Sequence, residues 1–238
     1  MKISKEFIEK IPKTDLHLHL DGSLRLPTLI ELARENGVTL PAYSEEELRR
    51  LVFKDKYDSL TDYLKGFAYT TAVMQTPSAL ERVGYELAQD NQSEGVRYIE
   101  VRFAPQLHQN SRMSSIEVMA ALNRGLARAK EEFNARAEVK SGEEPSFEYG
   151  IIACAMRMFD HGFSEYFDTL LNVHAHSERK WIFSLASQEL VRAAVEAKTQ
   201  LNLPIVGFDL AGAEAGYPAE DHAQAYALAH KNFLKKTV

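Results

Sequence analysis

The chain has little cysteine and no excess of positive charge. Of its 238 residues, Cys154 is the one cysteine, so an internal disulfide is excluded, and we expect this thiol to be a small core residue. Lys and Arg number 28 against 34 Asp and Glu, for a formal net charge of −6. Nucleic acids and anionic membranes attract basic surfaces, so we predict neither as a partner.

Long apolar runs, sequence repeats and low-complexity tracts are also absent from the chain. No apolar stretch approaches the roughly 20 residues that span a bilayer, and the first residues lack the apolar centre of a secretory signal. We therefore expect a cytoplasmic protein. The hydrophobic share of 45% and the charged share of 26% are typical of a globular domain.

Apolar runs suited to strands alternate with segments of helical periodicity. The sequence predicts strands near residues 13–20, 96–103, 147–155, 203–210 and 234–238. It predicts helices near residues 27–36, 44–53, 59–73, 77–93, 114–135 and 219–231, and an exposed loop at 137–146. This alternation is typical of a parallel sheet covered by helices. A (β/α)8 TIM barrel takes about 250 residues, so we expect one α/β barrel domain over residues 1–238 that stops at its fifth strand, after about four and a half βα units.

The most informative stretch is residues 14–23, with the sequence TDLHLHLDGS. Residues two apart in a strand project from the same face, so His17 and His19 should point together, while Leu16, Leu18 and Leu20 point the other way. Two neutral imidazoles side by side can hold one zinc ion, each about 2 Å from it. The turn that follows places the pair at the C-terminal end of the strand, which carries the chemistry in α/β barrels. The sequence therefore predicts the beginning of a hydrolase metal site.

Four segments resemble signatures of adenosine deaminases and occur in the order found in that family. They are residues 13–23 (KTDLHLHLDGS), 98–105 (YIEVRFAP), 207–214 (GFDLAGAE) and, more weakly, 151–157 (IIACAMR). The resemblance implies a barrel of the metal-dependent hydrolase type with Zn²⁺ as cofactor. It also implies a small purine nucleoside as partner, with hydrolysis of adenosine, and of deoxyadenosine, to inosine and ammonia in purine salvage.

Carried over residue by residue, the resemblance implies that His17 and His19 bind zinc and that His19 also touches the substrate. Asp21 matches the position that contacts the ribose, where relatives acting on free adenine tend to have Glu. Gly212 matches the glycine whose backbone N–H donates to a purine nitrogen, since the lack of a side chain lets the backbone approach a base. Asp209 is implied either as a ligand contact or as a support for the hydrogen bonds of the site.

The predicted helix at residues 59–73 resembles the lid that covers the base in the family. Tyr63, Leu64 and Phe67 match its apolar residues, and ordinary helix core is the alternative for all three. Asp21 and Gly212 have structural alternatives as well, as a turn residue and as a glycine at a helix entry.

Other ionisable residues lack the spacing of a site. Glu100, Arg102 and Arg157 lie in or at the ends of strands, where we expect a buried ionic network rather than direct catalysis. A second His-x-His pair, His174 and His176, has neither strand alternation nor a turn after it, so we expect no metal there. We expect surface or packed positions for four other histidines: His108, His161, His222 and His230.

The resemblance also implies residues that this sequence does not contain. In the family a third histidine and an aspartate complete the zinc site, and the glutamate of a His-Ala-Gly-Glu run moves protons. That run would come directly after Val238. We therefore predict no catalytic residue within 1–238 and expect the chain by itself to be inactive, whether it is a fragment or its reading frame is cut short.

Two other functions fit part of the sequence. A nucleoside-binding protein without catalytic activity would account for the missing residues, and a stop codon after Val238 would favour it. The DLHLH pattern also resembles the first motif of polymerase-and-histidinol-phosphatase phosphoesterases, which bind several metals and carry basic residues for phosphate. The segment 207–214 argues against that class. The oligomeric state stays open.

Overall fold

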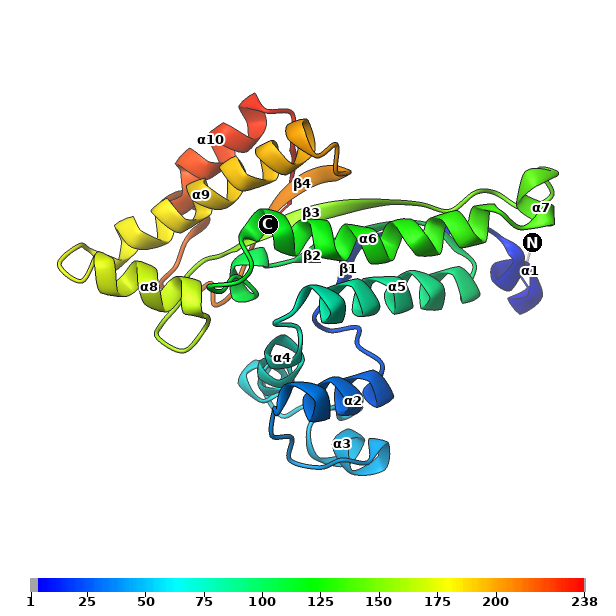
Figure 1. Cartoon of the computed structure of the whole chain (residues 1–238), viewed down its shortest axis with the longest axis horizontal. Coiled ribbons are helices and arrows are strands. Elements are labelled where there is room, and N and C mark those ends of the chain that lie inside the picture. The colour runs from blue at the N-terminus through cyan, green and yellow to red at the C-terminus, as the bar shows by residue number, and fades with distance from the viewer. Residues whose placement is uncertain (1–3, 238) are drawn as a thin grey trace.

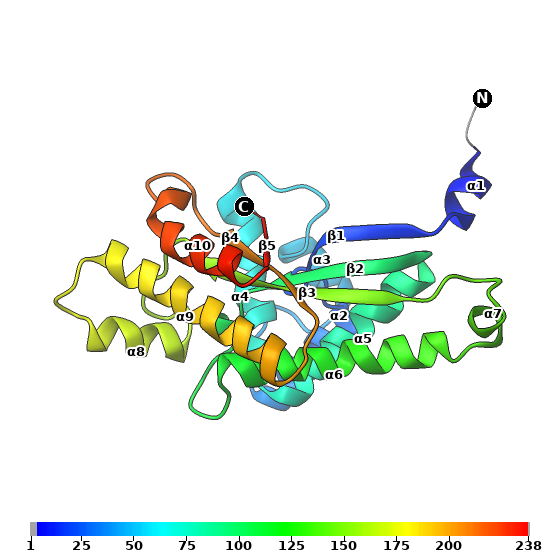
Figure 2. The same cartoon turned by 90° about the horizontal axis from the view of Figure 1, so that it is seen from above.

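Five parallel strands form one sheet in the order of the sequence, in a computed structural model that describes residues 4–237 and all their side chains except those of residues 60 and 61. The strands are β1 (Lys13–His19), β2 (Val96–Phe103), β3 (Glu148–Met156), β4 (Ile205–Ala211) and β5 (Lys235–Lys236). All five predicted strands are confirmed, although β5 is shorter than predicted, and Val238 lies outside the described part of the chain. Figure 2 shows β1 at one margin of the sheet.

Helices connect successive strands and pack beside the sheet (Figure 1). Between β1 and β2 lie α2 (Leu26–Asn36), α3 (Glu45–Leu51), α4 (Leu60–Val73) and α5 (Pro77–Ser93). The other helices are α1 (Lys5–Lys10), η1 (Pro105–Leu107), α6 (Ser115–Asn134), α7 (Ala137–Lys140), α8 (Glu165–Val173), α9 (Arg179–Gln200), η2 (Ala219–His222) and α10 (Ala223–Lys231). Within residues 4–237 no helix is long and apolar enough to cross a bilayer.

Serine hydroxyls fix where several predicted helices begin. The hydroxyl of Ser59 accepts a hydrogen bond from the backbone N–H of Asp62 at 3.1 Å and so begins α4. Ser114 begins α6 in the same way, and the side chain of Glu117 returns a bond to the Ser114 backbone. These contacts satisfy N–H groups that have no partner within the helix. They explain why the predicted starts of the two helices agree with the structure.

Three segments differ from the prediction. Helix α1, before the first strand, was not predicted. The polar stretch 137–146 contains the single-turn helix α7 rather than loop alone. Between β3 and β4, where no helix was predicted, the chain forms α8 and the 22-residue α9. The buried face of α9 includes Ala186, Ala194 and Ala197. Small residues of this kind add little to a hydrophobic pattern, so the helical periodicity is weak in the sequence.

The side chains of β2 alternate between the two faces of the sheet, as a strand requires. Ile99, Val101 and Phe103 are at most 1% exposed and form part of the main hydrophobic core. Tyr98, Glu100 and Arg102 project from the opposite face. The polar side chains that concern function therefore share the face that the helices leave free.

Strand β1 is paired along one edge only, with β2. The register shifts between Asp15 and Leu18. Leu20 is fully buried and Leu18 packs against the core, but Leu16 is 55% exposed. The predicted apolar face of the strand is thus covered toward its C-terminal end and exposed at Leu16. No strand within residues 4–237 pairs with the other edge of β1.

Candidate functional site

His17 and His19 lie side by side at the C-terminal end of β1. Their ring centroids are 5.3 Å apart and the ring planes are tilted by 56°. The backbone N–H of His17 donates to the Asp15 carboxylate at 3.1 Å, which helps to hold this irregular part of the strand. His17 is exposed and His19 is half-buried, so the pair can be reached from solvent.

His19 is in the form of imidazole that a metal requires. Partial burial, the nearby Arg102 guanidinium and His17 together lower the pKa of His19 to about 4. The ring is therefore neutral at pH 7, and the neutral ring has a free lone pair for a metal ion. The donor chemistry of the pair fits zinc. No group of three or more His, Cys, Asp or Glu side chains able to hold a metal occurs within residues 4–237, so the pair supplies only part of a closed ligand set.

Arg102 links His19 to residues on β3 and β4. Its Nε lies 2.5 Å from Oδ2 of Asp209 in an ion pair whose side chains are 7% and 1% exposed. Its Nη2 lies 2.6 Å from Sγ of Cys154, and its Nη1 lies 3.1 Å from both ring nitrogens of His19. Burial raises the pKa of the Cys154 thiol, which keeps it protonated and makes it a poor metal ligand. The expected core position of Cys154 is confirmed.

The expected ionic network is correct only in part. Arg102 pairs with Asp209 inside the protein, and buried Arg157 pairs with exposed Glu214 at 3.4 Å. Glu100 makes no ion pair with a described residue. Its carboxylate accepts a hydrogen bond from the Tyr98 hydroxyl at 2.8 Å, and burial with this contact raises the pKa of Tyr98 to about 12.

Three buried carboxylate oxygens in this region make no hydrogen bond within the protein. They are Oδ1 of Asp21 and both oxygens of Asp209, of which Oδ2 has its ion-pair contact with Arg102. The Asp21 atom lies 3.9 Å from Nδ1 of His19, which is too far for a hydrogen bond. Buried polar atoms are nearly always paired, so an unpaired one indicates a place for a ligand, ion or water. The alternative of Asp21 as a turn residue alone leaves this atom unexplained.

Gly212 directly follows β4 and has a φ of +110°, a conformation that side chains other than hydrogen rarely allow. A Cβ at this position would lie 3.6 Å from Cε of Met156 and 3.7 Å from the backbone nitrogen of Arg157, which are ordinary contacts. Backbone conformation, rather than lack of space, therefore requires glycine here.

Helix α4 brings an aromatic row to the end of β1. The Phe67 ring lies 3.7 Å from the point where a Cβ of Gly22 would be, and Tyr63 packs edge-on against Phe67 with centroids 5.3 Å apart. Tyr57 extends the row on Tyr63 at 5.1 Å. Tyr63 and Leu64 are 43% and 46% exposed. The alternative of ordinary helix core is therefore wrong for these two side chains.

The other histidines occupy separate surroundings. His174 ends α8 and packs edge-on against Trp181, with centroids 5.1 Å apart. His108 and His222 are buried; His222 lies between the Ser187 hydroxyl and the carbonyl of Arg157. His161 lies 3.1 Å from Asp168, and His230 lies 2.8 Å from the Lys236 amine. The expected surface or packed positions are thus observed.

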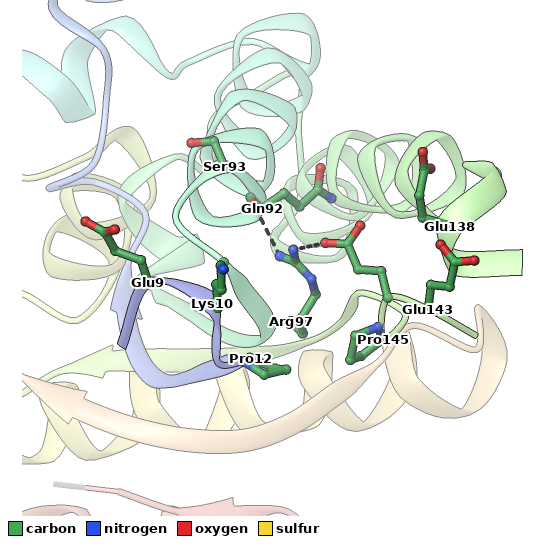
Figure 3. Close-up of a pocket in the computed structure, with 11 residues that line it drawn as sticks. Glu9, Lys10, Pro12, Gln92, Ser93, Arg97, Glu138, Glu143 and Pro145 are labelled. Atoms are coloured by element: carbon green, nitrogen blue, oxygen red, sulfur yellow. Dashed lines mark hydrogen bonds and ion pairs between the residues drawn. The ribbon is translucent and has the colours of Figure 1, made fainter. Parts of the chain in front are cut away.

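A cavity of about 500 Å³ lies at the opposite end of the sheet, where β1, β2 and β3 begin (Figure 3). Arg97 pairs with the carboxylate of Glu144 and donates to the carbonyl of Gln92, toward which it points in Figure 3. Of the charged side chains that line this cavity, Arg97 and Glu144 pair with each other. In barrels the chemistry lies at the other end of the strands, so this cavity is not the candidate site.

The chain resembles known proteins in sequence and in fold. A sequence model of the family described as "Adenosine deaminase" matches residues 12–175. The "Probable adenosine deaminase" of Dictyostelium discoideum is 32% identical over 238 residues, which is 100% of this chain and 26% of that protein. "Adenosine deaminase 1" of Streptomyces coelicolor is 36% identical over 225 residues, 94% of this chain and 48% of that protein. The chain thus spans about a quarter to a half of the length of these two relatives.

Solved structures share the fold. The N6-methyl-AMP deaminase of Arabidopsis thaliana superposes with a TM-score of 0.66 at 23% identity, covering 97% of this chain and 58% of that one. An amidohydrolase from Burkholderia ambifaria with bound Zn gives a TM-score of 0.71 at 17% identity, covering 99% and 54%. The predicted incomplete α/β barrel is therefore confirmed. The family match also overturns the phosphoesterase alternative.

Proposed function

Because the chain belongs to the adenosine deaminase family, we propose that residues 1–238 carry the nucleoside-binding part of a zinc-dependent adenosine deaminase, within a single barrel domain. The reaction is the hydrolysis of adenosine, and of deoxyadenosine, to inosine and ammonia in purine salvage. A cytoplasmic location stays a prediction. The observation that carries the proposal is the link between β1 and β4, where Arg102 joins His19 to Asp209 at one end of the sheet.

His17 and His19 are the two metal ligands in this proposal. Their rings are adjacent, and His19 is neutral at pH 7. Zinc, when bound, would lower the pKa of water to about 7 and so supply a nucleophile at neutral pH. The choice of zinc is supported by the Burkholderia ambifaria structure, which was solved with this metal.

Asp21 and Gly212 bind the nucleoside at its two ends. The buried, unpaired Oδ1 of Asp21 accepts a hydrogen bond from a ribose hydroxyl. The backbone N–H of Gly212 donates to a purine nitrogen, and its φ of +110° directs the main chain without a side chain in the way. A purine ligand is supported by two related Arabidopsis structures, which contain GMP and IMP.

Leu64 and Phe67 cover the base from α4, together with Tyr63. Their partial exposure suits side chains that are completed by a flat apolar ligand rather than by the core. Such a cover excludes water from the base and strengthens the polar contacts beneath it. Asp209 holds Arg102 in place and keeps Oδ1 available for the ligand or its hydrogen bonds.

No residue of 1–238 matches the proton-transferring glutamate that the family implies, and no cluster within residues 4–237 completes the metal site. We therefore expect the 238-residue chain alone to lack turnover. The decisive experiment records intact mass, zinc content and the absorbance change of adenosine on one sample. Turnover that a chelator abolishes, in a protein heavier than 26.9 kDa, supports the proposal for the longer protein. Nucleoside binding without zinc or turnover at any mass supports the non-catalytic alternative instead. Turnover at 26.9 kDa contradicts the expected need for a further glutamate.

A variant of Asp21 tests the ribose contact. Asp21→Ala should lower kcat/KM of the active protein for adenosine by about 10- to 100-fold, because a hydrogen bond to a charged group contributes about 1.5–3 kcal/mol. Asp160→Ala, which removes a surface partner of Arg179, is the control and should leave kcat/KM unchanged. An Asp21→Ala protein with wild-type kcat/KM would show that this carboxylate is only a turn residue.

A further inference from the structure

Arg102 contacts several residues of the site, but the proposed function gives it no role of its own. It is 6% exposed and lies opposite His19 in the register of β1 and β2. The main chain adds a contact, because the backbone N–H of Leu20 donates to the Arg102 carbonyl at 3.1 Å. Both the backbone and the side chain of Arg102 therefore act on the C-terminal end of β1, where the two histidines lie.

The guanidinium group lies over the face of the His19 ring. Its Nη1 is 3.1 Å from Nδ1 and also 3.1 Å from Nε2. A nitrogen equally close to both within the ring plane would overlap Cε1, so it must lie above the plane. The lone pair of an imidazole nitrogen lies in the ring plane. This contact therefore constrains the ring without covering the lone pair that a metal would use.

The other two contacts hold the guanidinium in that position. Nε is paired with Asp209 of β4 at 2.5 Å, and Nη2 lies 2.6 Å from Sγ of Cys154 on β3. Within residues 4–237 no other cation pairs with Asp209, and the ion pair keeps Nε of Arg102 next to that carboxylate. A planar guanidinium held at two of its nitrogens has less freedom to rotate. A lysine ammonium lacks the planar shape, and its three N–H donors all lie on one nitrogen.

We propose that Arg102 is a positioning residue for His19: held by Asp209 and Cys154, its guanidinium stacks on the His19 ring and sets the orientation in which that ring presents its nitrogen to zinc. The inference rests on the proposed function, since it gives His19 the role of a metal ligand. Partners that orient a metal-binding histidine typically contribute 10- to 100-fold to metal affinity or activity. This one acts through the ring face rather than through the second ring nitrogen.

The test compares Arg102→Lys with wild type in the active protein that contains residues 1–238. Zinc affinity, measured by competition with a chromophoric chelator, should fall by about 10- to 100-fold. In the metal-free protein, NMR should show the ring signals of His19 displaced, because the cation over its face has moved. The signals of His108 and His222 should stay in place, since both rings are buried in other surroundings and report that the protein is folded.

A second variant separates positioning from a loss of stability. Arg102→Ala should lose zinc affinity and regain part of it on addition of methylguanidinium, which can re-enter the space between Asp209 and His19. The matched control is Arg97→Ala on the same strand, whose guanidinium pairs with Glu144 at the other end of the sheet. The zinc affinity of this control should equal that of wild type, with no response to methylguanidinium.

Each outcome decides the inference. Unchanged zinc affinity in Arg102→Lys overturns it, and so does reduced affinity with the His19 signals in their wild-type positions. A wild-type protein that binds no zinc and turns over no adenosine contradicts the proposed function instead. In that case the metal-free His19 signals alone decide whether Arg102 orients the ring.

Discussion

Arg97 and Arg102 lie on the same strand, five residues apart, and their surroundings differ in kind. Arg97 pairs with Glu144 and donates from Nη1 to the carbonyls of Gln92 and Val96 at 3.0 and 2.8 Å. Its guanidinium carbon lies 4.6 Å from the centre of the Phe133 ring. All these partners belong to the framework of the protein, so Arg97 completes the end of the sheet where the strands begin.

Arg102 contacts groups that are suited to chemistry: the imidazole of His19, the thiol of Cys154 and the carboxylate of Asp209. Near these contacts, Asp21 and Asp209 each keep one buried oxygen without a protein partner. Stability alone does not favour buried polar atoms that stay unpaired. At one end of the sheet Arg97 is fully paired with the framework of the protein, whereas the other end keeps polar groups available for a ligand.

Of the changes considered, removal of the Asp209 carboxylate should have the largest effect on the free energy of unfolding. Asp209→Ala leaves the Arg102 guanidinium buried without a counter-charge, which typically costs about 3–5 kcal/mol of unfolding free energy. Urea unfolding of wild type and variant measures the difference. A loss below about 1 kcal/mol, the range of exposed ion pairs, would show that the pair is solvated despite its burial.

Gly212 and Gly142 both need a positive φ, and they lie at opposite ends of the sheet. Their φ angles are +110° and +81°, and an alanine at either position should cost about 1–3 kcal/mol through backbone strain. Gly212→Ala should also weaken adenosine binding, measured as KM or by calorimetry, because Gly212 is proposed to donate to the base. Gly142→Ala should lose stability alone. Equal effects of the two variants on adenosine binding would contradict the role of Gly212.

The smallest effect is expected at the framework end. Glu144→Gln removes the charge that faces Arg97 but leaves the two carbonyl contacts, and the Glu144 side chain is 30% exposed. The unfolding free energy should change by about 0–1 kcal/mol, and zinc affinity should equal that of wild type. A clear fall in zinc affinity would show instead that the two ends of β2 are coupled.

Much of the fold could be predicted because the signals are local. Ser114, Glu117 and the apolar spacing after them define α6 without knowledge of the rest of the chain. Helix α9 could not be recognised in this way. Half of its buried residues are alanines or Ser187, and such small residues mark a helical face only weakly in the sequence.

In the candidate site, too, the features with a local signal in the sequence were predicted and those that depend on long-range contacts were not. A spacing of two residues was enough to place His17 beside His19, and the segment around Asp209 and Gly212 was found through its resemblance to a family. The contact between His19, Arg102 and Cys154 was not found. It joins three strands, and the alignment of neighbouring strands follows from long-range pairing rather than from any local pattern.

The open edge of β1 has a thermodynamic consequence for any ligand of its histidines. Among residues 4–237, only β2 pairs with this strand. Any partner that pairs with the free edge and restricts the motion of the strand raises the affinity of His17 and His19 for a metal ion. By linkage, the ion must then favour that pairing by the same factor. Metal binding and pairing of the free edge of β1 are therefore coupled by one free energy, and each can be measured through the other.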